Sequence, residues 1–109
     1  MGSGSALRRA IDPAVAAVFE VEVQISPRAR RSPRAAFARQ VAMYLAHVVC
    51  GLSLTEVGMM FARDRPTVAL ACGVVEDRRD DPELDSRLDH LERAIASLID
   101  ALSWYRDSR

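Results

Sequence analysis

Two arginines and a threonine fall within five consecutive residues, from Arg63 to Thr67. A guanidinium group can form paired hydrogen bonds with a phosphate or with the O6 and N7 atoms of guanine, and a threonine methyl can contact the methyl of thymine. The chemistry available to this cluster is therefore noncovalent recognition of a nucleic acid.

A second group of arginines lies between Ser26 and Arg34, in a stretch that contains two prolines, four arginines and no acidic residue. The prolines predict an irregular loop. The net charge of the chain is zero but unevenly distributed: residues 1–40 carry seven arginines and three acids, whereas residues 76–93 carry four arginines and eight acids. We therefore expect a polyanion to bind near the arginine-rich end and to be repelled by the acidic segment.

The remaining polar residues do not form a pattern that is typical of an enzyme or a metal site. His47 and His90 have no partner at catalytic or metal-binding spacing, and Cys50 and Cys72 are not arranged as in a zinc site. We therefore expect no enzymatic activity, no metal and no cofactor. The sequence shows neither a signal peptide nor an apolar stretch long enough to cross a bilayer, so we expect a cytoplasmic, nucleoid-associated protein without membrane contact.

The apolar periodicity predicts helices that position both arginine clusters. Residues 1–11 are expected to be flexible, and a first helix is expected to begin near Asp12, with Pro13 in its first position. A long helix is expected over residues 34–49, in which apolar residues recur at helical spacing. These residues are Phe37, Val41, Tyr44, Leu45 and Val48. With the two short helices that follow, residues 12–79 are expected to form one all-α domain.

Two short helices separated by a tight turn come next. Residues 53–56 (Ser-Leu-Thr-Glu) match the capping box that begins many helices, and the helix that they open is expected to end near Phe61. Asp64 is expected to cap a second helix that runs to Asp77, with Pro66 in its first turn. This is a helix-turn-helix pattern, in which the first residues of the second helix enter the major groove of DNA.

The pattern predicts an amphipathic helix from residue 83 to residue 106. Its apolar residues recur at alternating steps of four and three, which is typical of a helix packed along its length against another helix. This seam consists of Leu84, Leu88, Leu91, Ile95, Leu98, Leu102 and Tyr105. Three arrangements stay open: the helix folds back onto its own domain, pairs with a second copy to form a homodimer, or binds another protein such as a component of the transcription machinery.

The order and spacing of many residues resemble the C-terminal DNA-binding domain, domain IV, of the bacterial replication initiator DnaA. The similar residues lie in Ala38–Ala46 and Gly51–Gly58 and continue through Phe61, Arg63-Asp64, Thr67-Val68 and Ala71-Cys72. The resemblance covers roughly residues 13–79, about two thirds of the chain. It implies a helix-turn-helix bundle like that of DnaA domain IV, here with an added C-terminal helix.

The resemblance also implies which residues contact double-stranded DNA. In the family, an arginine of the basic loop enters the minor groove, residues of the long helix and of the capping box contact phosphate, and the start of the second short helix reads bases in the major groove. Carried over to this sequence, the minor-groove residue is Arg31, with Arg28, Arg30 and Arg34 as neighbours. The residues expected at phosphate are Arg39, His47, Ser53, Leu54 and Thr55. The residues expected to read bases are Arg63, Asp64, Arg65, Pro66 and Thr67.

The sequence departs from DnaA in two respects. The family pattern Gly-Gly-Arg-Asp-His-Thr-Thr-Val reads Ala-Arg-Asp-Arg-Pro-Thr-Val over residues 62–68, so one turn glycine is missing and Pro66 replaces a base-reading threonine. The sequence also contains no Gly-rich phosphate loop for ATP. We therefore expect a stand-alone relative that binds a target other than the initiator box.

Such a relative is expected to regulate transcription, with activation favoured over repression. Free-standing domains of this type in alphaproteobacteria include activators of gene-transfer-agent clusters. The alternative is an interaction adaptor or a replication-control accessory that acts mainly through the C-terminal heptad helix.

Overall fold

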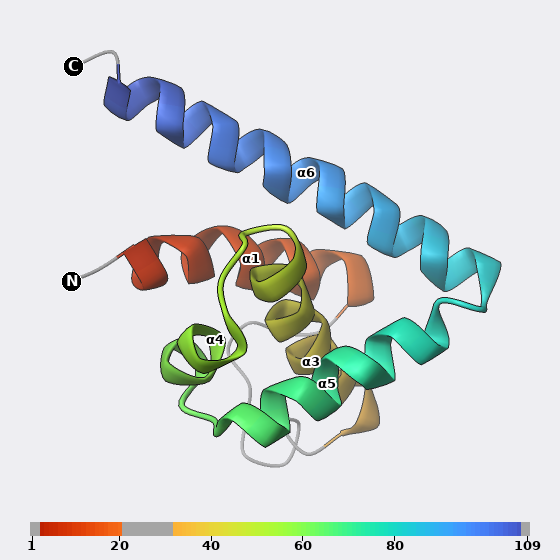
Figure 1. The fold of residues 1–109 in the computed structure, drawn as a ribbon. Coiled ribbons are helices and arrows are strands. Elements are labelled where there is room, and N and C mark those ends of the chain that lie inside the picture. Colours follow the sequence, from red (N-terminus) through yellow and green to blue (C-terminus); the bar gives the residue numbers. More distant parts are fainter. Residues whose placement is uncertain (1–2, 21–31, 108–109) are drawn as a thin grey trace.

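The computed structural model describes residues 3–20 and 32–107, and within these two ranges it contains five helices and no strand. In chain order the helices are α1 (Ser3–Phe19), α3 (Pro33–Val48), α4 (Leu54–Phe61), α5 (Arg65–Arg78) and α6 (Pro82–Asp107). Figure 1 shows α6 crossing above α1, with α4 and α5 at the lower side of the bundle. The all-α fold class expected from the sequence is confirmed.

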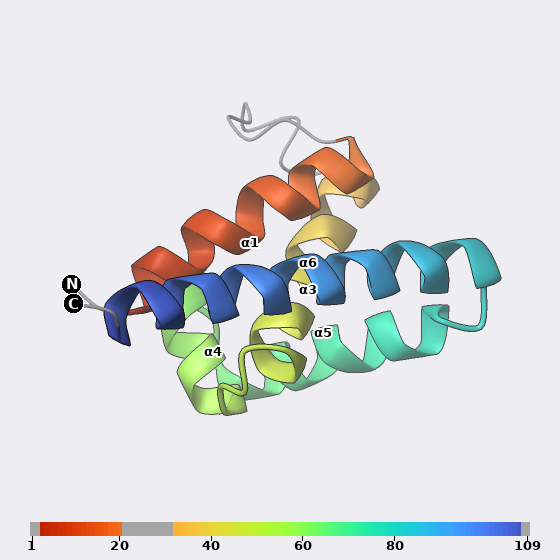
Figure 2. The same cartoon turned by 90° about the horizontal axis from the view of Figure 1, so that it is seen from above.

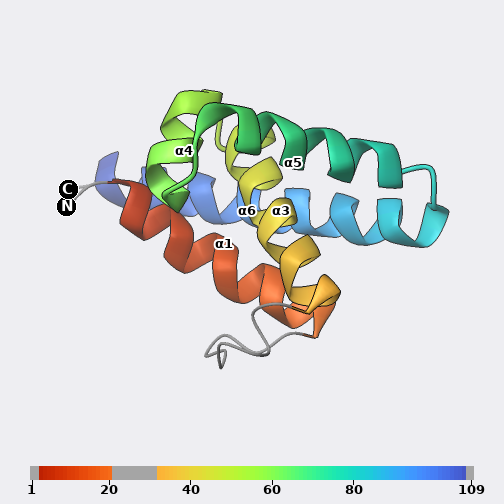
Figure 3. The same ribbon diagram turned by 90° about the horizontal axis from the view of Figure 1, so that it is seen from below.

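Helix α3 lies at the centre of this bundle. The six consecutive residues from Val41 to Ala46 are all buried, so the helix is covered on every side over that stretch. Helices α1, α4 and α5 pack directly against it. Figures 2 and 3 show the bundle from above and from below, with α6 on one side of α3 and α4 and α5 on the other. Val48, which was expected on the apolar face, is 48% exposed because it ends the helix.

Helix α1 begins at Ser3, so the expectation that the first helix starts near Asp12 is wrong. The reason is packing. Ile11 is 0% exposed and Val15 is 2% exposed, and both lie in the same hydrophobic core as residues of α3. Burial of this face stabilises helical turns whose local sequence gives no starting signal.

Asp12 and Pro13 lie inside α1 instead of at its beginning. The carboxylate of Asp12 accepts a hydrogen bond from Nε of Arg8, one turn earlier, at 3.0 Å. The Arg8 guanidinium also lies over the ring of Phe61, with its central carbon 4.4 Å from the ring centroid, and donates to the carbonyl oxygen of Met60 at 3.4 Å. These contacts hold the first half of α1 against the end of α4. They also help to keep α1 helical at Pro13, which has no backbone N–H to donate.

The first half of α6 packs against its own domain. Leu88, Leu91 and Ile95 are at most 2% exposed and belong to the hydrophobic core, and Leu84 is partly buried against it. Of the three arrangements that the heptad pattern left open, the structure therefore shows the intramolecular one for this half of the seam. Among the described helices, none has both the length and the apolar character that crossing a membrane requires.

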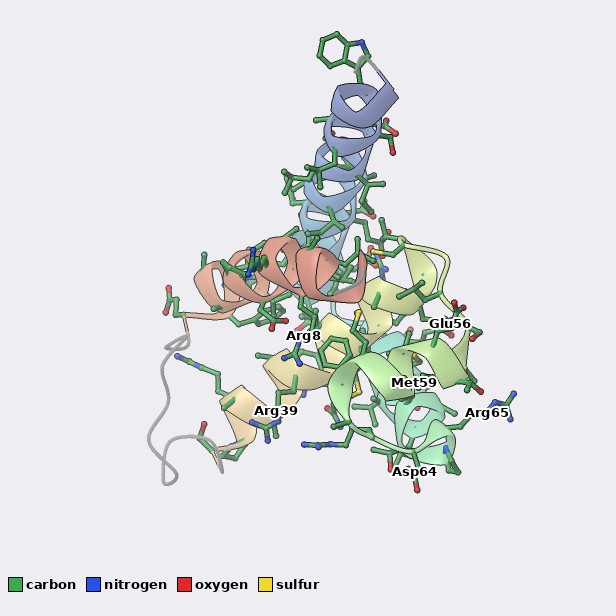
Figure 4. All side chains as sticks on the ribbon, turned by 90° about the vertical axis from the view of Figure 1, so that its left-hand side faces the viewer. Arg8, Arg39, Glu56, Met59, Asp64 and Arg65 are labelled. Atoms are coloured by element: carbon green, nitrogen blue, oxygen red, sulfur yellow. The ribbon has the colours of Figure 1, made fainter. Side chains whose placement is uncertain are left out.

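The second half of α6 diverges from the bundle, as Figures 1 and 4 show. Leu98 is 43% exposed and Leu102 is 45% exposed, so the expectation of packing along the whole seam is wrong for this chain taken alone. Here α6 diverges from α1, which leaves these two leucines partly exposed among the described residues. The side chain of Tyr105 lies outside the described residues.

Arg79, the residue that follows α5, links α6 to α3. Its guanidinium donates to the carboxylates of Asp85, Asp89 and Glu92 on α6 and to the hydroxyl of Tyr44 on α3, the last at 3.0 Å. Burial alone would lower the pKa of Arg79, but these hydrogen bonds outweigh it and the pKa is raised. Three carboxylates of the acidic segment are therefore engaged within the fold.

Replacing Ile11 with alanine tests the packing of the first half of α1. We expect Ile11→Ala to lower the free energy of unfolding by about 2–5 kcal/mol, because it removes a fully buried side chain from the core. Arg9→Ala, on the exposed face of the same helix, is the matched control and should change stability little. Urea unfolding followed by circular dichroism measures both variants. Equal stability of the two variants would contradict the packing of α1.

Candidate nucleic-acid interface

A compact turn sets the angle between α4 and α5. Ala62 adopts a left-handed conformation (φ 56°, ψ 47°), and the backbone N–H of Arg63 donates to the carbonyl oxygen of Gly58 at 2.8 Å. A Cβ atom on Gly58 would lie 2.5 Å from the carbonyl oxygen of Arg63, which is too close for any side chain. The turn therefore closes without the family's second glycine, with alanine in the left-handed position and Gly58 supplying the space.

Asp64 begins α5 as expected. It has an extended backbone conformation, and its side chain accepts a hydrogen bond from the backbone N–H of Thr67 at 3.1 Å, which is the geometry of a helix cap. Hydrogen bonds from Thr67 lower the pKa of Asp64, so the carboxylate is ionised at neutral pH. Pro66 lies in the first turn, where its missing N–H is tolerated.

The packing of α5 directs the predicted base-reading residues outward. Val68, Ala71 and Val75 are at most 2% exposed and face the core, whereas all five residues from 63 to 67 are exposed. Figure 4 shows Arg65 extending away from the ribbon near Asp64. The positive end of the helix dipole coincides with Arg63 and Arg65.

The opposite end of α5 carries the exposed acids Glu76 and Asp77. The last turn also contains the exposed Arg78, so a polyanion is attracted most strongly at the first turn of α5.

The capping box at the start of α4 is confirmed. The hydroxyl of Ser53 accepts a hydrogen bond from the backbone N–H of Glu56 at 3.1 Å, and the backbone N–H of Ser53 donates to the Glu56 carboxylate at 2.9 Å. The backbone hydrogen bond from Ser53 is the main cause that lowers the pKa of Glu56. The Ser53 hydroxyl is thus used for capping. Of the other two residues expected at phosphate here, Thr55 is exposed and Leu54 is partly buried.

His47 has a structural partner within the chain. Its Nδ1 atom lies 2.7 Å from the carbonyl oxygen of Leu52. Because a carbonyl oxygen can only accept, Nδ1 is the donor. This hydrogen bond fastens the end of α3 to the residues that precede α4, so His47 positions the start of α4. Contact of His47 with phosphate stays a prediction.

The remaining arginines of the expected interface are spread out. Arg34, near the beginning of α3, has a side chain that is 64% exposed and lies 4.0 Å from the carboxylate of Glu20. Figure 4 separates Arg39 from Asp64 and Arg65, so the structure does not gather these residues into one pocket. The residues expected in or beside the minor groove, Arg28, Arg30 and Arg31, lie outside the described residues.

Sequence reasoning missed three features of this region. It did not connect Arg8 with Phe61 or Arg79 with α6, and it did not single out Leu70, which is 68% exposed on α5. The acids at positions 85, 89 and 92 share one face of a helix and could have indicated a partly buried cationic partner, which the structure shows to be Arg79. The exposure of Leu70 follows from its position on the helix, opposite the valines of the core.

The family model for the bacterial DnaA protein helix-turn-helix matches residues 9–75. The chain belongs to this family. It is similar to the chromosomal replication initiator protein DnaA of Lachnoclostridium phytofermentans, with 43% identity over 67 residues, and to DnaA 2 of Chlamydia trachomatis, with 39% identity over 64 residues. It is 36% identical over 84 residues to DnaA 1 of Protochlamydia amoebophila.

These matches cover 60%, 59% and 76% of the chain in that order, but only 15%, 14% and 19% of the three DnaA proteins. No solved structure gives a significant match to the chain. The family-model match includes α3, α4 and most of α5 and ends before α6. The chain therefore contains a DNA-binding helix-turn-helix domain of the DnaA type.

Substitution of Gly58 tests the close approach in the turn. We expect Gly58→Ala to lower the free energy of unfolding by about 1–3 kcal/mol, because the turn must shift to accept the added methyl group. Gly73→Ala is the matched control: its Cβ would meet nothing within 4 Å, and alanine in this exposed helix position should raise stability by roughly 0.5–1 kcal/mol. Thermal unfolding distinguishes the two, and a Gly58→Ala variant as stable as the parent would contradict the turn geometry.

Proposed function

We propose that this protein is a sequence-specific regulator of transcription that binds double-stranded DNA. In the proposal, α5 reads the major groove with the residues from Arg63 to Thr67, and the segment from Arg28 to Arg34 reaches the minor groove. The observation that supports it most is the outward exposure of Arg63, Arg65 and Thr67 at the positive end of a capped helix in a DnaA-type helix-turn-helix.

The altered first turn of α5 supports a target other than the initiator box. Pro66 stands where the family has a base-reading threonine, and its ring can only make apolar contacts, whereas Arg65 can form paired hydrogen bonds with guanine. Activation of transcription requires DNA binding and a surface for protein contact, and it requires no catalytic step. We therefore propose an activator without enzymatic activity that acts at the nucleoid.

The decisive experiment selects bound duplexes from a randomised pool with the purified full chain and then compares variants on the selected site. Arg65→Ala should weaken binding by about 1–3 kcal/mol and relax the base preference at one position. Arg93→Ala on α6, an exposed arginine outside the interface, should bind as the parent does.

Arg34→Ala should weaken binding to all sequences alike and reduce the slope of affinity against salt by about one. Failure of the chain to retain any duplex in a salt-sensitive manner would overturn the proposal. Selection of the initiator box itself would overturn only the altered target.

The exposed end of α6 supports a homodimer. Leu98, Leu102 and Trp104 are 43%, 45% and 71% exposed, and Asp100 is the one charged residue in positions 94–105. A single helix-turn-helix contacts few base pairs, and a second copy bound to an adjacent half-site multiplies the affinity. The second candidate, an interaction adaptor, is supported by the same surface if its occupant is a different protein.

Charged substitutions at this end distinguish the two candidates. The parent chain should show the mass of a dimer by light scattering, and the double variant Leu98→Asp, Leu102→Asp should show the mass of a monomer. Its circular dichroism should be unchanged, because neither leucine is buried. Ala17→Asp, on the exposed face of α1, is the control and should stay dimeric. A monomeric parent chain would exclude the homodimer and favour the adaptor.

A further inference from the structure

Helix α5 carries an uncharged line of residues on the face that points away from the core. Val68 and Val75 are completely buried on one face. Pro66, Leu70 and Gly73, spaced by four and three residues, lie on the opposite face. The side chain of Leu70 makes this line prominent, since the residue is 68% exposed.

Beyond its first turn, α5 has little capacity to read bases by hydrogen bonding. Among the exposed residues of positions 66–73, Thr67 alone has a hydrogen-bonding side chain, and the others are proline, alanine, leucine and glycine. The exposed residues of positions 68–73 can therefore offer apolar side-chain contacts only. In the major groove, the base-edge group that apolar side chains recognise is the 5-methyl group of a pyrimidine.

We propose that Leu70, together with Pro66, recognises pyrimidine 5-methyl groups in the target of this protein. This inference rests on the proposed function, in which α5 enters the major groove. The methyl group can come from thymine or from 5-methylcytosine, which present it at the same position of the groove. Leu70 is thereby a specificity-determining residue one turn beyond the base-reading residues from Arg63 to Thr67.

Gly73 contributes by leaving space beside Leu70. Apart from the adjoining residues and the backbone of α5, a Cβ atom built on Gly73 meets no described atom within 4 Å, so that part of the helix surface is open and its backbone can approach a base edge closely. Arg65 precedes the apolar line and Asp77 follows it on the same face. Attraction at Arg65 places the adjoining segment from Pro66 to Gly73 against the bases.

An exposed leucine is by itself ordinary on a protein surface. Met59 is even more exposed, at 79%, but it lies on α4 and not on the proposed recognition helix. Leu70 differs because it belongs to α5, the helix that follows the turn, and lies on the face away from the core. It also lies on the same face as Pro66, which is one of the predicted base-reading residues. These three properties together assign it to the bases of the major groove.

The test uses the purified full chain and its selected duplex. Each thymine within the α5 footprint is replaced in turn by deoxyuridine, which lacks only the methyl group, and each cytosine by 5-methylcytosine. The readout is the ratio of dissociation constants for the modified and unmodified duplexes. Loss of one contacted methyl should weaken binding about fourfold, since one buried methylene is worth about 0.8 kcal/mol and tenfold about 1.4 kcal/mol.

Leu70→Ala should bring that ratio to about one while retaining salt-dependent binding, because alanine is compatible with an exposed helix position. Arg93→Ala, at an exposed residue of α6 outside the proposed DNA interface and the leucine seam, is the control and should keep the ratio of the parent chain. Circular dichroism verifies that both variants are folded.

The possible outcomes separate the inference from the proposed function. A deoxyuridine effect that Leu70→Ala abolishes supports thymine as the source, and a gain with 5-methylcytosine that the same variant abolishes supports methylated cytosine. Salt-dependent binding without a methyl effect, or a methyl effect that Leu70→Ala leaves intact, overturns the role of Leu70 but not DNA binding. A change in the mass of the free protein on Leu70→Ala would show a protein interface and also overturn it. Absence of any duplex binding overturns the proposed function itself.

Discussion

The burial of α3 is the constraint on which the other features depend. Because the residues from Val41 to Ala46 are covered on every side, the helices around α3 have fixed positions relative to it. The valines at 68 and 75 fix the rotation of α5 about its own axis against this core. That rotation decides which residues of α5 face solvent. The chemistry of the helix surface is therefore a consequence of packing on its other face.

The features that the sequence predicted well are those whose physical cause is local. The caps at Ser53 and Asp64 involve a side chain and an amide three residues apart, so the residue types alone indicate them. The helix-turn-helix and the all-α class follow from the same short-range signals, and the family follows from the resemblance in residue order and spacing. The outward exposure of the residues from Arg63 to Thr67 was predicted as well, because a capped helix start on a surface turn leaves them uncovered.

The features that were predicted wrongly depend on partners distant in the chain. The start of α1 was missed because its stabilising contacts are with α3, α4 and the ring of Phe61. The length of the packed seam on α6 could not be predicted, since it depends on where α6 diverges from α1. The role of His47 at the Leu52 carbonyl depends on the path of one loop. Apolar spacing predicts that a face is covered, but it does not identify what covers it.

The single tryptophan of the chain, Trp104, is 71% exposed and lies near the end of α6. The helix-turn-helix contains no tryptophan. Intrinsic indole emission therefore arises at one pole of the molecule alone. The unlabelled protein therefore reports events at that pole alone, and a fluorophore attached near α5 would report events at the recognition helix in a separate spectral range.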